Sequence, residues 1–235
     1  MSPSGDRRFE WFVPKFGPTK FRIAVGLLYL PYTGMVISYT VIGAMLAPKL
    51  YWDRVTAIGV IYFFGLGIAA HALDAIGGKT SVKPWGEHFS PKSLLRIVIT
   101  SLIIAYGIGL YYIVTVSPWL MVIALLEGFF LFAYNLEWFD GRFHTDGWFA
   151  FSWGMLPVSA GFVIETNTLS YSALTFSAAM GLTSLVEIKA SRPYKISKRL
   201  GESNPDQTQY EAILKAISLS VILLAIGMIL WRLQD

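Results

Sequence analysis

The sequence predicts an all-α polytopic membrane protein, a helical bundle with about seven transmembrane helices. Composition is the first observation: 54% of the 235 residues are hydrophobic and 14% are charged, whereas a soluble domain usually carries about 25% charged residues. The second is a series of apolar runs of about 20 residues, the length that spans the hydrocarbon core as a helix. The third is the aromatic content, sixteen Phe, twelve Tyr and eight Trp, because such rings favour the core and the membrane interfaces.

Two regions follow from this pattern. Residues 1–22 are polar, contain prolines and lack the apolar stretch of a signal peptide, so we expect a cytoplasmic N-terminal segment. Residues 23–235 should form a single transmembrane helical domain. The predicted spans are 23–47, 55–76, 94–115, 118–136, 147–165, 169–190 and 211–232.

The distribution of Lys and Arg predicts the orientation. Of the nineteen Lys and Arg residues, sixteen fall on one side of the predicted spans and three on the other. Because cytoplasmic loops carry the excess, we expect the N-terminus in the cytoplasm and the C-terminus outside, in the plasma membrane. The basic residues adjoin the spans, so no nucleic-acid partner is expected. The chain has no cysteine, which excludes disulfides and thiolate metal sites.

An ionisable pair closes the second predicted span. His71 and Asp74 are three residues apart, which places both on one face of a helix. Lys79 and Lys83 follow in a basic loop. Asp74 is suited to bind Mg²⁺, which is usually held by one or two carboxylates together with phosphate oxygens. His71 is suited to donate a hydrogen bond to a phosphate or to orient Asp74. The alternative is a solvated interfacial pair.

A second polar region lies between the fourth and fifth spans. Its polar residues are Tyr134, Asn135, Glu137, Asp140, Arg142, His144 and Asp146. They form either an ordinary interfacial loop with an Asp-Gly turn or one wall of a cavity at the inner mouth.

The third polar region ends the sixth span. Glu187 and Ser191 are four residues apart and share a helix face. The basic residues around and after them, which include Arg192 and Lys195, either anchor the chain to anionic lipid or form a lid that binds phosphate.

Polar and helix-breaking residues also fall inside the spans. Glu127 lies near the middle of the fourth span, where a carboxyl group is costly, so we expect it to be protonated or hydrogen-bonded to a Tyr, Ser or Thr of a neighbouring helix. Pro31 and Pro157 should kink their helices and free backbone carbonyls.

Several of these stretches resemble the UbiA superfamily of intramembrane prenyltransferases. Residues 70–78 (AHALDAIGG) occupy the place of the Asp-rich motif that closes the family's second helix. Residues 83–86 (KPWG) resemble the basic proline loop that follows it. Tyr134 and residues 154–158 (GMLPV) are similar to the family's stretch after the fourth helix. Asp74 is the one acidic residue kept from the first motif, Glu187 stands for the second, and the chain has fewer spans than the family usually has.

The resemblance implies Mg²⁺-dependent transfer of a prenyl group from an isoprenyl diphosphate to an aromatic or lipid acceptor. The metal ligands would be Asp74 and Glu187. The catalytic group would be Asp74, His71, Glu187 and Tyr134, and the substrate-binding group Lys79, Lys83, Asn135, Arg142, Arg192 and Lys195.

Two other functions stay open. One is a catalytically degenerate UbiA-like bundle that binds a lipid or quinone, or serves as a subunit beside partner proteins in a membrane complex. The other is a small transporter that uses Glu127.

Overall fold

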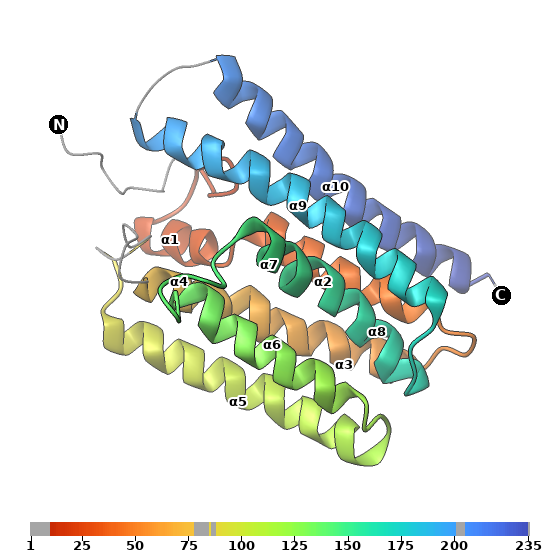
Figure 1. Cartoon of the computed structure of the whole chain (residues 1–235). Helices are drawn as coiled ribbons and strands as arrows, with labels where there is room; N and C mark the ends of the chain where they lie inside the picture. The colour runs from red at the N-terminus through yellow and green to blue at the C-terminus, as the bar shows by residue number, and fades with distance from the viewer. Residues whose placement is uncertain (1–9, 78–84, 86–87, 201–204, 235) are drawn as a thin grey trace.

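The described part of the chain is entirely helical. The computed structural model describes residues 10–77, 85, 88–200 and 205–234, and no strand occurs among them. Long helices lie side by side, and α1 begins at one end of the bundle while α10 ends at the other (Figure 1). Within the described residues, five helical segments are long and apolar enough to cross a membrane: Thr19–Met45, Trp52–Ile76, Pro91–Thr115, Asp146–Thr166 and Asp206–Arg232. These segments indicate a membrane protein, as the composition predicts.

The two other predicted spans differ from these five. Helix α6 (Leu120–Asn135) is apolar but has 16 residues, a length of about 24 Å against a hydrocarbon core of about 30 Å. Helix α9 (Tyr171–Leu200) has 30 residues and includes Pro193. Its second half carries the basic residues that the sequence placed after the span. The count of seven spans and the orientation therefore stay predictions.

Helix α1 (Thr19–Leu27) and helix α2 (Leu30–Met45) are the two parts of the first span. Tyr29 has a left-handed backbone (φ 44°), and Pro31 stands in the first turn of α2, where its missing N–H is tolerated. The break frees the carbonyl of Leu28, which accepts a hydrogen bond of 2.6 Å from the Thr33 hydroxyl. The predicted kink at Pro31 is thus confirmed, as a complete break.

Two further spans contain a π-helical segment. Helix α3 (Trp52–Tyr62) continues through η1 (Phe63–Ala70) into α4 (His71–Ile76). Helix α7 (Asp146–Ala150) continues through η2 (Phe151–Met155) into α8 (Leu156–Thr166). A π-helical turn is wider than an α-turn, re-aims the side chains that follow it and is frequent at functional sites. Pro157 lies directly after η2, in the first turn of α8.

The closest helix crossing joins α2 to α8. A Cβ atom on Gly43 would collide with the carbonyl group of Val158, and one on Gly161 with the carbonyl group of Thr40. The two backbones therefore pack against each other with no side chain between them at these points. This crossing forms the centre of the bundle.

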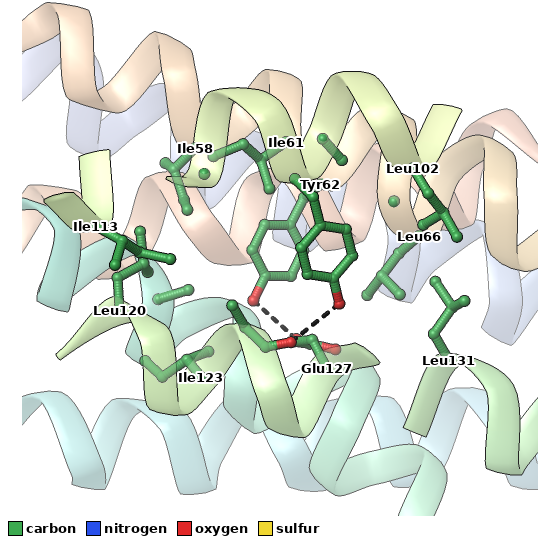
Figure 2. Close-up of a pocket in the computed structure, with 16 residues that line it drawn as sticks. Ile58, Ile61, Tyr62, Leu66, Leu102, Ile113, Leu120, Ile123, Glu127 and Leu131 are labelled. Atoms are coloured by element: carbon green, nitrogen blue, oxygen red, sulfur yellow. Dashed lines mark hydrogen bonds between the residues drawn. The ribbon is translucent and has the colours of Figure 1, made fainter. Parts of the chain in front are cut away.

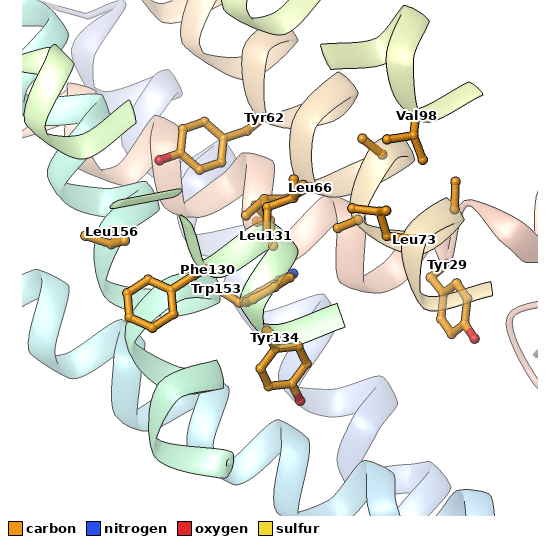
Figure 3. Packing of buried hydrophobic residues seen from close by; sticks show 14 of the residues in the cluster. Tyr29, Tyr62, Leu66, Leu73, Val98, Phe130, Leu131, Tyr134, Trp153 and Leu156 are labelled. Atoms are coloured by element: carbon orange, nitrogen blue, oxygen red, sulfur yellow. The ribbon is translucent and has the colours of Figure 1, made fainter. Parts of the chain in front are cut away.

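The other helices surround that centre with apolar side chains. Figure 3 shows the main cluster, which includes Tyr62, Leu66, Leu73, Val98, Phe130, Leu131, Trp153 and Leu156. Helices α5 (Pro91–Thr115) and α10 (Pro205–Arg232) lie at the periphery. Large apolar residues on both are exposed, for example Ile103 at 67% and Leu223 at 55%, as expected for surfaces that face lipid.

Candidate functional site

A cavity of about 340 Å³ lies among the start of α2, the η1–α4 segment, the end of α6, the loop after α6, η2 and the second half of α9. The sequence-predicted residues that line it are His71, Asp74, Tyr134, Asn135, Glu187, Arg192 and Lys195. The polar ends of the second and sixth predicted spans therefore meet at one cavity. Lys79 and Lys83 lie outside the described residues.

Arg142, which the sequence predicts to bind substrate, is exposed and does not line this cavity. Glu137, Phe139 and Asp140 have left-handed backbones, and Gly141 also has a positive φ. This tight turn brings His144 to the cavity and leaves Arg142 on the outer surface.

Asn135 is buried and donates through Nδ2 to the carbonyl oxygen of Leu131 at 2.8 Å.

One wall of the cavity carries His71 and Asp74, so the predicted shared face is confirmed. The His71 ring stacks on Tyr29, with 4.5 Å between ring centroids and 19° between planes. Its Nε2 lies 3.4 Å from the Thr33 hydroxyl oxygen. The break between α1 and α2 thus positions the two residues that orient His71.

The opposite wall is α9. The sequence suggested a loop or lid after residue 190, but the helix continues to Leu200. Glu187, Ser191 and Lys195 therefore follow one another at intervals of four residues along one helical stripe. Glu187 and Ser191 are buried, and the Lys195 ammonium lies near the Glu187 carboxylate and 5.8 Å from the Tyr29 ring centroid.

Arg192 lies at the edge of the cavity in an ion pair with Asp146. The distance between Arg192 Nη2 and Asp146 Oδ1 is 3.0 Å, and Lys189 Nζ lies 4.0 Å from Asp146 Oδ2. Asp146 is the first residue of α7, whose N-terminus is capped by the Thr145 hydroxyl. These contacts connect α9 to the start of α7 and hold the guanidinium group beside the cavity.

Aromatic rings form another part of the cavity wall. Tyr134 stacks on His144 at 4.4 Å between centroids and lies 4.9 Å from Trp153, which in turn stacks on Phe149 at 5.4 Å. His144 Nδ1 lies 2.9 Å from the Tyr134 carbonyl oxygen. In Figure 3 the Tyr134 hydroxyl points away from the apolar cluster. Sequence reasoning missed Phe149 and Trp153, since aromatic residues in a membrane span look like ordinary core.

Residues Glu10 and Phe12 of the N-terminal segment pack behind this site. Phe12 stacks on Tyr29 at 4.9 Å between centroids, and Glu10 is buried near Tyr194 of α9. Because Tyr194 is buried and lies near the carboxylates of Glu10 and Glu211, its pKa is raised above the ordinary value for tyrosine. Phe12 therefore packs against Tyr29, which lines the cavity.

The described residues contain no group of three or more His, Asp or Glu side chains arranged to hold a metal ion. Three carboxylates, those of Asp74, Glu137 and Glu187, line the same cavity, and the sequence predicts Asp74 and Glu187 as the metal ligands. Mg²⁺ keeps several non-protein ligands and is often bound by one or two carboxylates plus substrate phosphates. A magnesium ion held by Asp74 and Glu187 and shared with a phosphate-bearing ligand stays a prediction.

Comparison with family models, with curated proteins and with solved structures finds no match to this chain. The likeness to the UbiA superfamily therefore stays a resemblance carried by the residues quoted above.

Proposed function

We propose that this chain is a UbiA-like membrane prenyltransferase, which transfers a prenyl group from an isoprenyl diphosphate to an aromatic or lipid acceptor. The observation that supports the proposal is a single cavity that combines three carboxylates, two cationic side chains and an aromatic wall. By the bias of Lys and Arg the cavity faces the cytoplasm, where a diphosphate is available.

The charged residues would bind the diphosphate. Arg192 and Lys195 supply N–H donors for phosphate oxygens. Asp74 and Glu187 would hold Mg²⁺ together with those oxygens. The metal would neutralise part of the charge on the diphosphate as it leaves.

In the reaction, the bond between the allylic carbon and the diphosphate oxygen breaks, and the diphosphate leaves with the electron pair. The ring faces of Tyr134 and Trp153 shield the allylic cation from water and stabilise it. The acceptor forms the new bond to that carbon and loses a proton. His71, which lines the cavity and is held by Tyr29 and Thr33, is the residue suited to accept it.

A second candidate is a catalytically degenerate UbiA-like bundle that binds a lipid or quinone, or serves as a subunit of a membrane complex. The observation that favours it is that both cations already face carboxylates of the chain: Arg192 pairs with Asp146, and Lys195 lies near Glu187. Purification from native membranes separates the two. A stoichiometric partner protein, or a copurified lipid without turnover, supports the second candidate.

The direct test is product formation by the purified chain from labelled isoprenyl diphosphate, Mg²⁺ and a lipid extract. We expect Asp74→Asn and Glu187→Gln to lower turnover at least about tenfold, because each removes a carboxylate that is proposed to hold Mg²⁺. EDTA should abolish turnover, and added Mg²⁺ should restore it. The matched control is Asp140→Asn, which neutralises an exposed carboxylate in the loop after α6 and should leave turnover unchanged. Turnover that is insensitive to Asp74→Asn refutes the assignment.

A further inference from the structure

A second, smaller cavity of about 70 Å³ lies between α3, η1, α5 and α6 (Figure 2). Leu66 lines both this cavity and the charged one. Its wall is mainly apolar, with side chains such as Ile58, Leu102 and Ile123. Among the described residues that line it, the polar side chains are Tyr62, Tyr106 and Glu127. It is therefore an apolar cavity with one polar spot.

That polar spot is incompletely paired. The Tyr62 hydroxyl donates to Glu127 Oε1 at 2.8 Å, as Figure 2 shows, which confirms the predicted hydrogen bond to a neighbouring helix. The Tyr106 hydroxyl donates to the carbonyl oxygen of Ala124 at 3.1 Å. Glu127 Oε2 is buried and has no hydrogen-bond partner among the described residues. A polar atom left unpaired in an apolar setting is costly, and a ligand that pairs with it relieves that cost.

The cavity also has unused space along its wall. Gly65 and Gly109 both line it. A Cβ atom on Gly65 would meet nothing within 4 Å, and one on Gly109 would meet the Ile61 side chain alone, at 3.9 Å. A water-sized group needs about 10–15 Å³ of such space. The cavity thus admits the head and first carbons of a chain-like molecule.

The cavity reaches the outer surface of the bundle. Tyr106 lines it and is itself 43% exposed, next to the exposed Leu110 on α5. This part of α5 is the peripheral apolar surface that faces lipid in a membrane. A ligand therefore has a direct path from the bilayer.

We propose that this cavity binds the hydroxyl end of an uncharged, lipid-soluble alcohol that enters from the bilayer beside α5. A hydroxyl both donates and accepts, so it pairs with the unpartnered oxygen of Glu127, and its hydrocarbon chain lies along the apolar wall. An amine is a poorer match, because bringing a cation into an apolar cavity costs far more than bringing a hydroxyl. The proposal does not depend on prenyl transfer in the charged cavity.

The test uses a photoreactive, diazirine-bearing hexadecanol with the full chain in detergent–lipid micelles, and mass spectrometry locates the cross-links. We expect cross-links on α5 and α6 residues that line the cavity, competed by hexadecanol and not by hexadecane. Glu127→Leu should lower this labelling at least about tenfold, the factor for one buried hydrogen-bond partner left unpaired. Gly109→Leu, which fills the space, should do the same.

Leu125→Ala is the control, since Leu125 lies on the exposed face of α6 and does not line the cavity; its labelling should match that of the wild type. Thermal unfolding of each variant verifies that it is folded, and Glu127→Leu keeps the test decisive if Gly109→Leu does not fold. Labelling spread evenly over lipid-facing helices, equal competition by hexadecane, or unchanged labelling of Glu127→Leu overturns the proposal.

Discussion

The crossing of α2 and α8 offers a quantitative test of the packing. In Gly43→Ala the new methyl group would collide with the Val158 carbonyl oxygen and lie 2.8 Å from its carbonyl carbon. Carbon atoms at their optimal separation are about 3.5–4.0 Å apart, so the helices must separate by about 0.7 Å or more. No side chain can move aside, because the obstacle is backbone.

The size of the effect follows from two opposing contributions. Overpacking a core costs about 1–3 kcal/mol, and the rigid obstacle places this change near the upper end. Alanine has a higher helix propensity than glycine, which offsets about 1 kcal/mol of this cost. The net loss of about 2 kcal/mol corresponds to a fall in Tm of about 4–8 °C for a chain of this size.

The assay is thermal unfolding in detergent micelles, followed by the fluorescence of the eight tryptophans. Gly161→Ala should behave like Gly43→Ala, since its methyl group would collide with the Thr40 carbonyl group. Gly107→Ala is the matched control, because a Cβ there meets nothing within 4 Å; its Tm should stay the same or rise. Equal Tm values for Gly43→Ala and Gly107→Ala would refute the close crossing.

Two further changes probe contacts between helices. Tyr39 is buried and accepts a hydrogen bond of 3.2 Å from the Ser184 hydroxyl on α9. Tyr39→Phe leaves the Ser184 hydroxyl unpaired, which costs about 1 kcal/mol and should lower Tm by about 2–4 °C. An unchanged Tm contradicts the contact. Arg54 donates to the carbonyl oxygen of Glu165 at 2.9 Å, at the C-terminal end of α8. Arg54→Leu should lower Tm by about 4–8 °C, since a hydrogen bond from a charged group is worth about 2 kcal/mol, and a stable variant would show that this end of α8 does not need it.

Much of the fold follows from local patterns in the sequence. The apolar runs locate every long helix, because the hydrocarbon demands continuous apolar side chains. Pro31 predicts the break in the first span, because proline cannot continue the preceding helix. The spacing of His71 and Asp74 predicts their shared face, and the depth of Glu127 predicts its hydrogen bond to a neighbouring helix.

Other features depend on tertiary packing, which a single sequence does not reveal. The segments η1 and η2 consist of residue types that also occur in α-helices, so the sequence contains no signal for their wider π-helical turns. Arg142 points outward because four of the five backbone positions before it have positive φ angles, three of them at residues other than glycine. Tyr29 becomes the stacking partner of His71 because the break between α1 and α2 brings it there.

The central claim is that the cavity between α4 and α9 binds an isoprenyl diphosphate. A photoreactive isoprenyl diphosphate, cross-linked to the purified chain with and without excess inorganic pyrophosphate, tests it most directly. We expect pyrophosphate-sensitive cross-links to residues that line this cavity, such as Tyr134 and Trp153. Cross-links confined to the lipid-facing side of α5, and unaffected by pyrophosphate, would contradict it.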